Sequence, residues 1–143
     1  YKVDRAGKST VFFDPSDKYI WALALDDSGR LYVGTGDKGV IYRVTPDGKG
    51  SVFYETRATH VLSFAFDEKG NLLAGTESPG RVFRIDPSGK PFVVLDSGFR
   101  EIRSLLALAD ESGALPGPEY ADTVPYPLNA GQLCKKIACL LGC

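Results

Sequence analysis

The sequence predicts an all-β chain made of copies of one four-stranded unit, and three observations lead to this fold class. The chain aligns with itself at an offset of 41 residues, the spacing that separates Tyr1, Tyr42 and Phe83. Short runs rich in β-branched and aromatic residues alternate with glycine turns, and no amphipathic helical period occurs before the C-terminal segment. A fixed period of this length indicates internal duplication.

The duplicated positions include strands and turns alike. Repeating segments are Tyr1-Lys2-Val3, Tyr42-Arg43-Val44 and Phe83-Arg84-Ile85, with the turns Gly7-Lys8, Gly48-Lys49 and Gly89-Lys90. We expect four strands in each complete copy, at 19–25, 30–35, 40–45 and 51–55 in the first and at 60–66, 71–76, 81–86 and 91–95 in the second. Four strands with a period near 40 residues are typical of a β-propeller blade, so the predicted fold is a partial β-propeller of about three blades.

A longer motif carries a resemblance to a known group of proteins. The pattern D-x-x-G-x-L is followed by G-T-x-x-x-G-x-[VI]-[YF]-R-[VI], once from Asp26 and once from Asp67. Over residues 1 to about 115 the chain resembles NHL-like and gluconolactonase-like bacterial propellers. The resemblance implies that the innermost strand begins each blade. The chain would then start with the two outer strands of one blade, at 1–4 and 10–13, and enter a third blade at 102–108.

The strand count leaves the ring of blades incomplete. Propellers hold about four to eight blades, and residues 1–115 contain only about 2.8 periods. The third copy is two residues longer between Glu101 and Gly113 than its equivalents, and Pro116-Gly117-Pro118 then replaces the expected second strand. Outer strands at one end and an inner strand at the other are complementary. We therefore expect a homo-oligomer, a dimer that closes a six-bladed ring through these open edges.

A tail follows the repeats, and we divide the chain into blade repeats at 1–115 and a Pro-rich, Cys-containing tail at 116–143. Prolines at 116, 118, 125 and 127 predict an irregular start, and we expect a short helix over 130–141 and no further blade strand. The tail holds all three cysteines, Cys134, Cys139 and Cys143, which are disulfide candidates in an oxidising, secreted or periplasmic compartment. It could crosslink chains, cover an open blade face or be an extension without a selected function.

Charge and composition exclude several classes of function. Lys and Arg total 17 against 18 acidic residues, for a net charge of -1, and no long block of like charges occurs. A nucleic acid partner or an anionic membrane surface is therefore not expected. No apolar run reaches the length of a membrane span. Nothing in the sequence indicates a cofactor.

The candidate ligand-binding residues lie in loops. In the usual blade geometry, the loops that lead into each inner strand share one face with the loops between second and third strands. Loops on a rigid scaffold commonly carry binding residues. Side chains that differ between the copies gather in these loops, and the predicted binding set is Lys18, Asp37, Lys38, Arg57, His60, Glu77 and Arg100. Solvated turns without a partner are the alternative.

Other chemistry-bearing residues have a structural interpretation. Asp26, Asp67 and Asp110 recur in D-x-x-G turns, where aspartate accepts backbone hydrogen bonds, so we predict a turn role and no metal site. His60 is the only histidine and has no partners for a zinc site or a nucleophile triad, so no catalytic residue is assigned. A row on each inner strand is expected to form core between blades: Trp21, Leu23 and Leu25, then Leu62, Phe64 and Phe66.

These features favour a binding or interaction module that takes a protein or a carbohydrate as ligand on its loop face. The resemblance to gluconolactonase-like propellers leaves open a second interpretation, a fragment of a lactonase-like or lyase-like enzyme. A third interpretation is an engineered or evolutionary propeller fragment without a natural ligand. The lack of an assigned catalytic set favours a non-enzymatic role.

Overall fold

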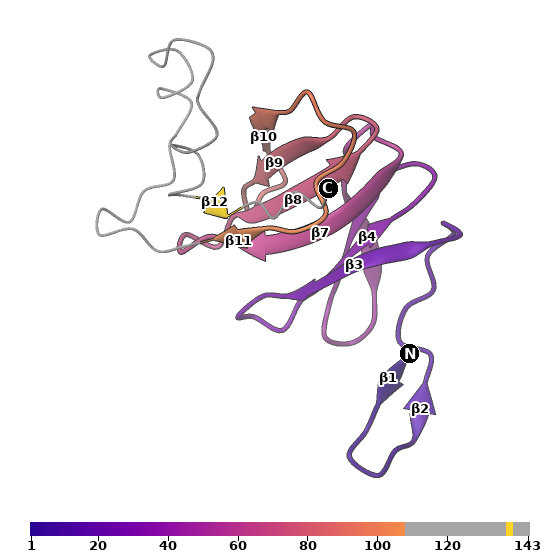
Figure 1. The fold of residues 1–143 in the computed structure, drawn as a ribbon. Coiled ribbons are helices and arrows are strands. Elements are labelled where there is room, and N and C mark those ends of the chain that lie inside the picture. The colour runs from indigo at the N-terminus through magenta and orange to yellow at the C-terminus, as the bar shows by residue number, and fades with distance from the viewer. Residues whose placement is uncertain (108–136, 139–143) are drawn as a thin grey trace.

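The computed structural model describes residues 1–107 and 137–138, and every regular element in those ranges is a β-strand (Figure 1). Two antiparallel four-stranded sheets follow one another along the chain. The first contains β3 (Ile20–Leu25), β4 (Leu31–Thr35), β5 (Val40–Val44) and β6 (Gly50–Glu55), and the second contains β7 (His60–Phe66), β8 (Leu72–Glu77), β9 (Arg81–Ile85) and β10 (Pro91–Asp96). Within the described ranges no helix is suited to cross a membrane. The predicted class, an all-β partial propeller, is confirmed.

The strand bounds of the two complete blades agree with the sequence to within one residue at every end. Each sheet is a meander in which sequential strands pair, as repeats separated by short glycine turns require. The flanking copies are less complete. At the N-terminus β1 (Lys2–Val3) pairs with β2 (Ser9–Thr10), and these strands are shorter than the predicted 1–4 and 10–13.

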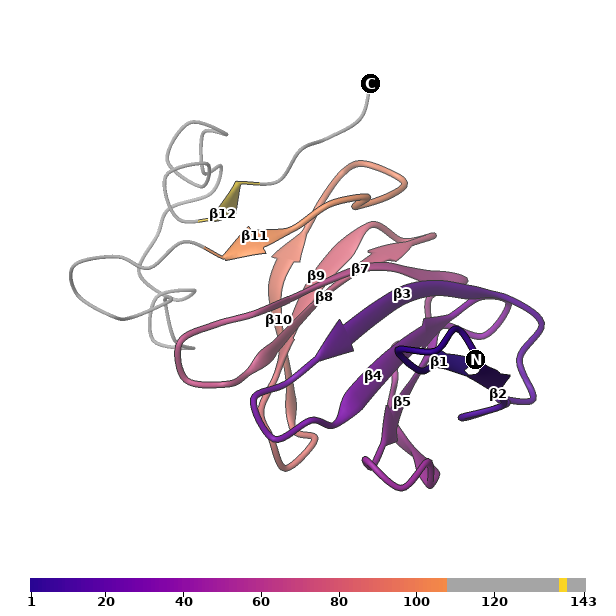
Figure 2. The ribbon, with the colours of Figure 1, turned by 90° about the horizontal axis from the view of Figure 1, so that it is seen from below.

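The inner strands of successive blades lie side by side. β7 lies between β3 on one side and β11 (Leu106–Ala107) on the other, and the two large sheets face each other across a shared core (Figure 2). Tyr32 lies in this core and meets the rings of Phe53 and Phe66 edge to face, at centroid distances of 5.1 and 5.4 Å. Fully buried members from both blades are Ile41, Val61, Leu72, Ala74 and Ile85. Burial of this apolar surface joins the two blades into one unit.

The aspartates of the D-x-x-G motif act as turn residues. Asp26 Oδ1 accepts hydrogen bonds from the amides of Ser28 and Arg30, both at 2.9 Å, while Gly29 takes a φ of 74°. Asp67 forms the same turn with Lys69 and Asn71. The predicted turn role is confirmed for these two aspartates, while Asp110 lies outside the described residues.

We expect the first of these turns to make stability depend on pH. Burial opposes ionisation of Asp26, but hydrogen bonds from the amide and guanidinium of Arg30 outweigh it and hold the pKa of the Asp26 carboxyl below its ordinary value of 3.8. A pKa depressed by folding stabilises the fold above the ordinary value, and this contribution is lost as the pH falls through the folded-state pKa. We therefore expect the free energy of unfolding in urea to fall less between neutral pH and about pH 3 for Asp26→Asn than for the unchanged chain; this fall is called the acid loss.

Asp27→Asn is the matched control, because Asp27 is exposed and accepts no hydrogen bond in the described turn. It should keep the full acid loss of the unchanged chain. Equal acid losses for Asp26→Asn and the unchanged chain would contradict the role given to this carboxylate.

The third copy begins with a buried segment and ends in a short strand. Ile102 is fully buried and Leu105 nearly so, and both pack on Leu73 and Val82 of the second blade. β11 pairs with β12 (Ile137–Ala138), which comes from the tail. The expectations of a helix over 130–141 and of a tail without strands are therefore wrong at 137–138, because the edge of β11 accepts a partner strand there. The remaining residues of the tail, including the three cysteines, lie outside the described residues.

One face of the first blade is open. Leu23 and Leu25 are 62% and 66% exposed and Trp21 is 53% exposed, so the prediction that this row forms core is wrong for the first blade. The equivalent Phe64 and Phe66 do pack against the shared core, as expected. The difference arises because the second blade has a preceding blade beside it, whereas the described residues place no inner strand beside β3 on its other side.

Candidate functional site

The loops predicted to carry the site do gather at one end of the blades, and we call this end the loop face (residues 14–19, 36–39, 55–60, 77–80 and 96–101). Backbone hydrogen bonds join these loops, both within a copy and between neighbouring copies. The amide of Gly36 donates to Tyr19 O at 2.9 Å, that of Thr59 to Glu77 O at 3.0 Å and that of Ser78 to Arg100 O at 2.9 Å. Each loop leading into an inner strand is thus fixed to a loop between second and third strands.

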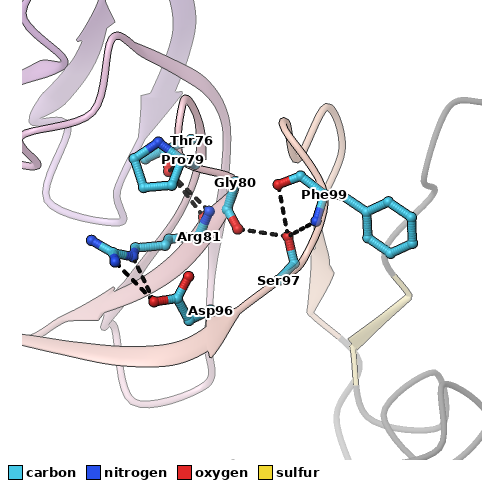
Figure 3. Close-up of polar contacts among 7 residues, drawn as sticks. All are labelled: Thr76, Pro79, Gly80, Arg81, Asp96, Ser97 and Phe99. Atoms are coloured by element: carbon cyan, nitrogen blue, oxygen red, sulfur yellow. Dashed lines mark hydrogen bonds and ion pairs between the residues drawn. The ribbon is translucent and has the colours of Figure 1, made fainter.

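Hydroxyl groups hold the loop face of the second blade in place (Figure 3). Thr76 Oγ1 donates to Pro79 O at 2.7 Å and accepts from the Arg81 amide at 3.1 Å. Ser97 Oγ donates to Gly80 O at 2.6 Å, which ties the loop at 96–101 to the same turn. In the first blade the equivalent hydroxyls of Thr35 and Thr56 make corresponding bonds. The repeat therefore supplies a rigid base for side chains that differ between copies.

Two further contacts anchor this base. Arg81 Nη2 forms an ion pair with Asp96 Oδ2 at 2.8 Å, and the hydrogen bond with Asp96 raises the pKa of the Arg81 guanidinium. Tyr42 donates a hydrogen bond of 2.6 Å to Asp17 Oδ2 in the first loop. That bond, together with burial, raises the pKa of the Tyr42 hydroxyl. The hydroxyl therefore stays protonated at neutral pH and keeps the loop attached to β5.

A row of aromatic side chains crosses the loop face from the first blade to the second, and we call Lys18, Tyr19, Trp21 and His60 the aromatic row. Lys18 Nζ lies 4.9 Å from the centre of the Tyr19 ring, in a cation–π contact. The ring centroids of Tyr19 and Trp21 are 5.8 Å apart, and those of Trp21 and His60 are 5.7 Å apart. Tyr19 and Trp21 are 40% and 53% exposed, so their rings are available to a ligand.

Gly36 allows the aromatic row to form. A Cβ atom at this position would lie 2.6 Å from Trp21 Nε1 and 2.8 Å from His60 Nδ1. Any residue with a side chain at position 36 would therefore require both rings to move. The next residue, Asp37, donates its amide to His60 Nδ1 at 3.4 Å and has a φ of 68°. This contact holds the imidazole beside the turn at Asp37.

The second blade replaces this arrangement with charge. Glu77 occupies the position equivalent to Gly36, faces His60 in the β7–β8 register, and forms an ion pair of 2.9 Å with Arg100 Nη2. The Glu77 side chain is only 14% exposed, whereas that of Arg100 is 77% exposed. A nearby pair of the same kind joins Arg103 Nε to Glu101 Oε1 at 2.9 Å. The loop face thus changes from aromatic to charged between one blade and the next.

The structure brings together five of the seven predicted site residues. Lys18 and His60 belong to the aromatic row, Asp37 contacts His60 through its backbone, and Glu77 pairs with Arg100. Lys38 and Arg57 are exposed in adjoining loops and form no ion pair within the described part of the chain.

Sequence reasoning did not assign Tyr19, Trp21 or Gly36 to the site. The available signal was that the first position of each inner strand changes from Tyr19 to His60 to Glu101, and that Trp21 differs from its equivalent Leu62. Differences at equivalent positions of a repeat indicate a role outside the common fold.

Among the described residues, no group of three His, Cys, Asp or Glu side chains is placed to hold a metal ion. At the opposite end of the blades a hollow of about 300 Å³ lies between the D-x-x-G turns, above Leu25 and Phe66. Of its four carboxylates, those of Asp26 and Asp67 are bound to turn amides, and those of Asp27 and Glu68 are exposed on the same turns. The loop face is therefore the better candidate for a ligand site.

Fold and site together define blades of a β-propeller whose variable side chains lie on one face. Residues 14–37 match the family model of the two component regulator propeller, a repeat of this class. The matched segment contains the first loop, β3, β4, Lys18, Tyr19, Trp21 and Asp37. A comparison with curated proteins gives no match for this chain. The match supports a propeller repeat, and the finer resemblance to NHL-like or gluconolactonase-like propellers stays a prediction.

Proposed function

We propose that the chain is a propeller-type interaction module whose loop face binds a protein or a carbohydrate. The aromatic row carries this proposal, because it is an exposed set of rings on a rigid base at the face where the copies diverge. Aromatic side chains expose much apolar surface with little conformational freedom to lose, and Tyr and Trp are enriched where interfaces bind tightly.

Charge surrounds the row and would select among ligands. Lys18 lies at one end, and Glu77 with the largely exposed Arg100 lies beyond His60. A ligand that stacks on Tyr19 and Trp21 could therefore reach both a cation and a carboxylate. The segment that matches the propeller family model, residues 14–37, includes most of the row, so the proposed surface belongs to a propeller repeat.

The fluorescence of Trp21 provides the test, because it is the only tryptophan in the chain. The unchanged chain should be titrated with soluble neutral oligosaccharides and oligosaccharides containing uronic acid, and with peptides selected on it from a random phage-displayed library. We expect a member of one of these sets to change the emission in a saturable way, and His60→Ala to weaken that binding about 10-fold.

Lys90→Ala is the matched control, since Lys90 is exposed in a turn at the opposite end of the second blade. It should bind like the unchanged chain. If no probe alters the emission, or if Lys90→Ala and His60→Ala weaken binding equally, the loop face is not the binding site.

A further inference from the structure

The open face of the first blade has a defined counterpart elsewhere in the chain. Leu23 and Leu25 on β3 correspond, at an offset of 41 residues, to Phe64 and Phe66 on β7. In the second blade that face packs on the side of the first blade that carries Tyr32. The repeat therefore shows what covers this kind of surface, which is the adjoining face of another blade.

The chain covers the open face only in part. The ring of Phe13 lies tilted against that of Tyr42 at a centroid distance of 5.5 Å and crowds Gly50, so the outer half of the face is partly covered. On the same face, Leu23, Leu25 and Val52 stay 62%, 66% and 53% exposed. Leu23 and Leu25, two residues apart on β3, form an exposed apolar patch of the kind that favours a protein interface.

Two incomplete blades of this chain complement each other. By the 41-residue offset, β1 and β2 correspond to the third and fourth strands of a blade, β5 and β6. β11 is a first strand, and β12 pairs with it in the position of a second strand. Among the described residues β1 pairs only with β2, and β12 pairs only with β11, so each pair has one unused edge.

We propose that two copies of this chain associate around a two-fold axis, each adding its β1–β2 pair to the other's β11–β12 pair. The order β11-β12-β1-β2 then reproduces the order β3-β4-β5-β6 of the first blade. The hybrid blade also brings the partner's inner strands over Leu23 and Leu25. Two complete blades per copy and two hybrid blades give a ring of six, which is within the usual range for propellers. This inference is independent of ligand binding at the loop face.

Analytical ultracentrifugation at micromolar concentration, with a reductant present, tests the proposal. We expect a species of twice the 15.5 kDa chain mass. The double variant Leu23→Asp with Leu25→Asp should weaken the dimer about 100-fold or more, because it would bury charges in an apolar interface. Val93→Asp is the matched control, since Val93 is 42% exposed on β10, an edge strand of the second blade that takes no part in the proposed contact.

Val3→Pro is the second variant, and it separates association from folding. Proline cannot donate a ladder hydrogen bond, so this change should prevent β1 from joining β12 and leave the two complete blades unaffected. The dimer should therefore weaken while the far-ultraviolet circular dichroism stays that of a β-sheet protein.

Four results would overturn the proposal. They are a monomer with a full β-sheet signal in the unchanged chain, a dimer that dissociates only when reductant is added, a dimer that both interface variants leave intact, and equal weakening by Val93→Asp. The second of these would assign association to the tail cysteines.

Discussion

Replacing Gly75 with valine is expected to reduce the free energy of unfolding by about 3 kcal/mol or more. Gly75 lies on β8 in contact with Ile102, and a Cβ atom added there would lie 2.8 Å from Ile102 Cγ2 and 2.9 Å from Ile102 O. It would also meet Ser63 Oγ, which donates a 3.1 Å hydrogen bond to the same carbonyl. A backbone oxygen cannot move aside cheaply, so the third copy would have to separate from the second blade.

Two comparisons make this test specific. Gly34→Val affects the equivalent position, where a Cβ would lie 2.9 Å from Val61 Cγ1 and 3.0 Å from Phe64 Cζ, and it should destabilise the contact between the first and second blades. Gly98→Ala is the control, because nothing lies within 4 Å of a Cβ there. In urea, the free energy of unfolding of Gly98→Ala should be close to that of the unchanged chain. If Gly75→Val is equally stable, the packing of Ile102 under β8 is wrong.

The strands and turns could be predicted because each depends on residues that are close together in the sequence, and the same pattern occurs in both copies. The Asp26 and Asp67 turns depend on hydrogen bonds within five residues, and the glycines at 34 and 75 recur at a fixed distance from them. Each strand is bounded by such a turn, so its limits follow from the sequence to within a residue. Two copies that agree at so many positions reduce the number of alternative assignments.

The burial of equivalent residues could not be predicted in the same way. Leu23 and Phe64 occupy the same position in their repeats, yet one is exposed and the other packs against the shared core. Burial depends on which blade lies alongside, and this is a tertiary property. The same limit explains Trp21, whose pattern indicates core but whose place beside Gly36 and His60 puts its ring on the loop face.

The strand at Ile137–Ala138 is the clearest departure from the sequence prediction. An apolar pattern compatible with a short helix gave way to pairing with β11, because an unpaired strand edge offers backbone hydrogen bonds that a local pattern does not reveal. The loop-face residues could be predicted more readily, because their side chains differ between the copies. What the sequence did not show is that Lys18 and His60 would be joined through Tyr19 and Trp21.

Replacing Phe83 with alanine is expected to cost about 3 to 5 kcal/mol in the free energy of unfolding. Phe83 is 3% exposed on β9, and its ring centroid lies 5.6 Å from that of Tyr54 in the first blade. The cavity would therefore open between the blades, where both sheets lose packing. Phe99→Ala is the control, because Phe99 is 63% exposed and a surface truncation changes stability by about 0.5 kcal/mol or less.

Two signals show whether the blades share this core as one cooperative unit. Trp21 emission reports the first blade, whereas far-ultraviolet circular dichroism reports both sheets. In repeat architectures the contact between neighbours couples their unfolding. Phe83→Ala changes only the second blade, yet it should shift the Trp21 transition to lower urea by as much as the circular dichroism transition. A Trp21 transition that stays at its original midpoint would show that the first blade is stable without the second, contrary to the shared core described above.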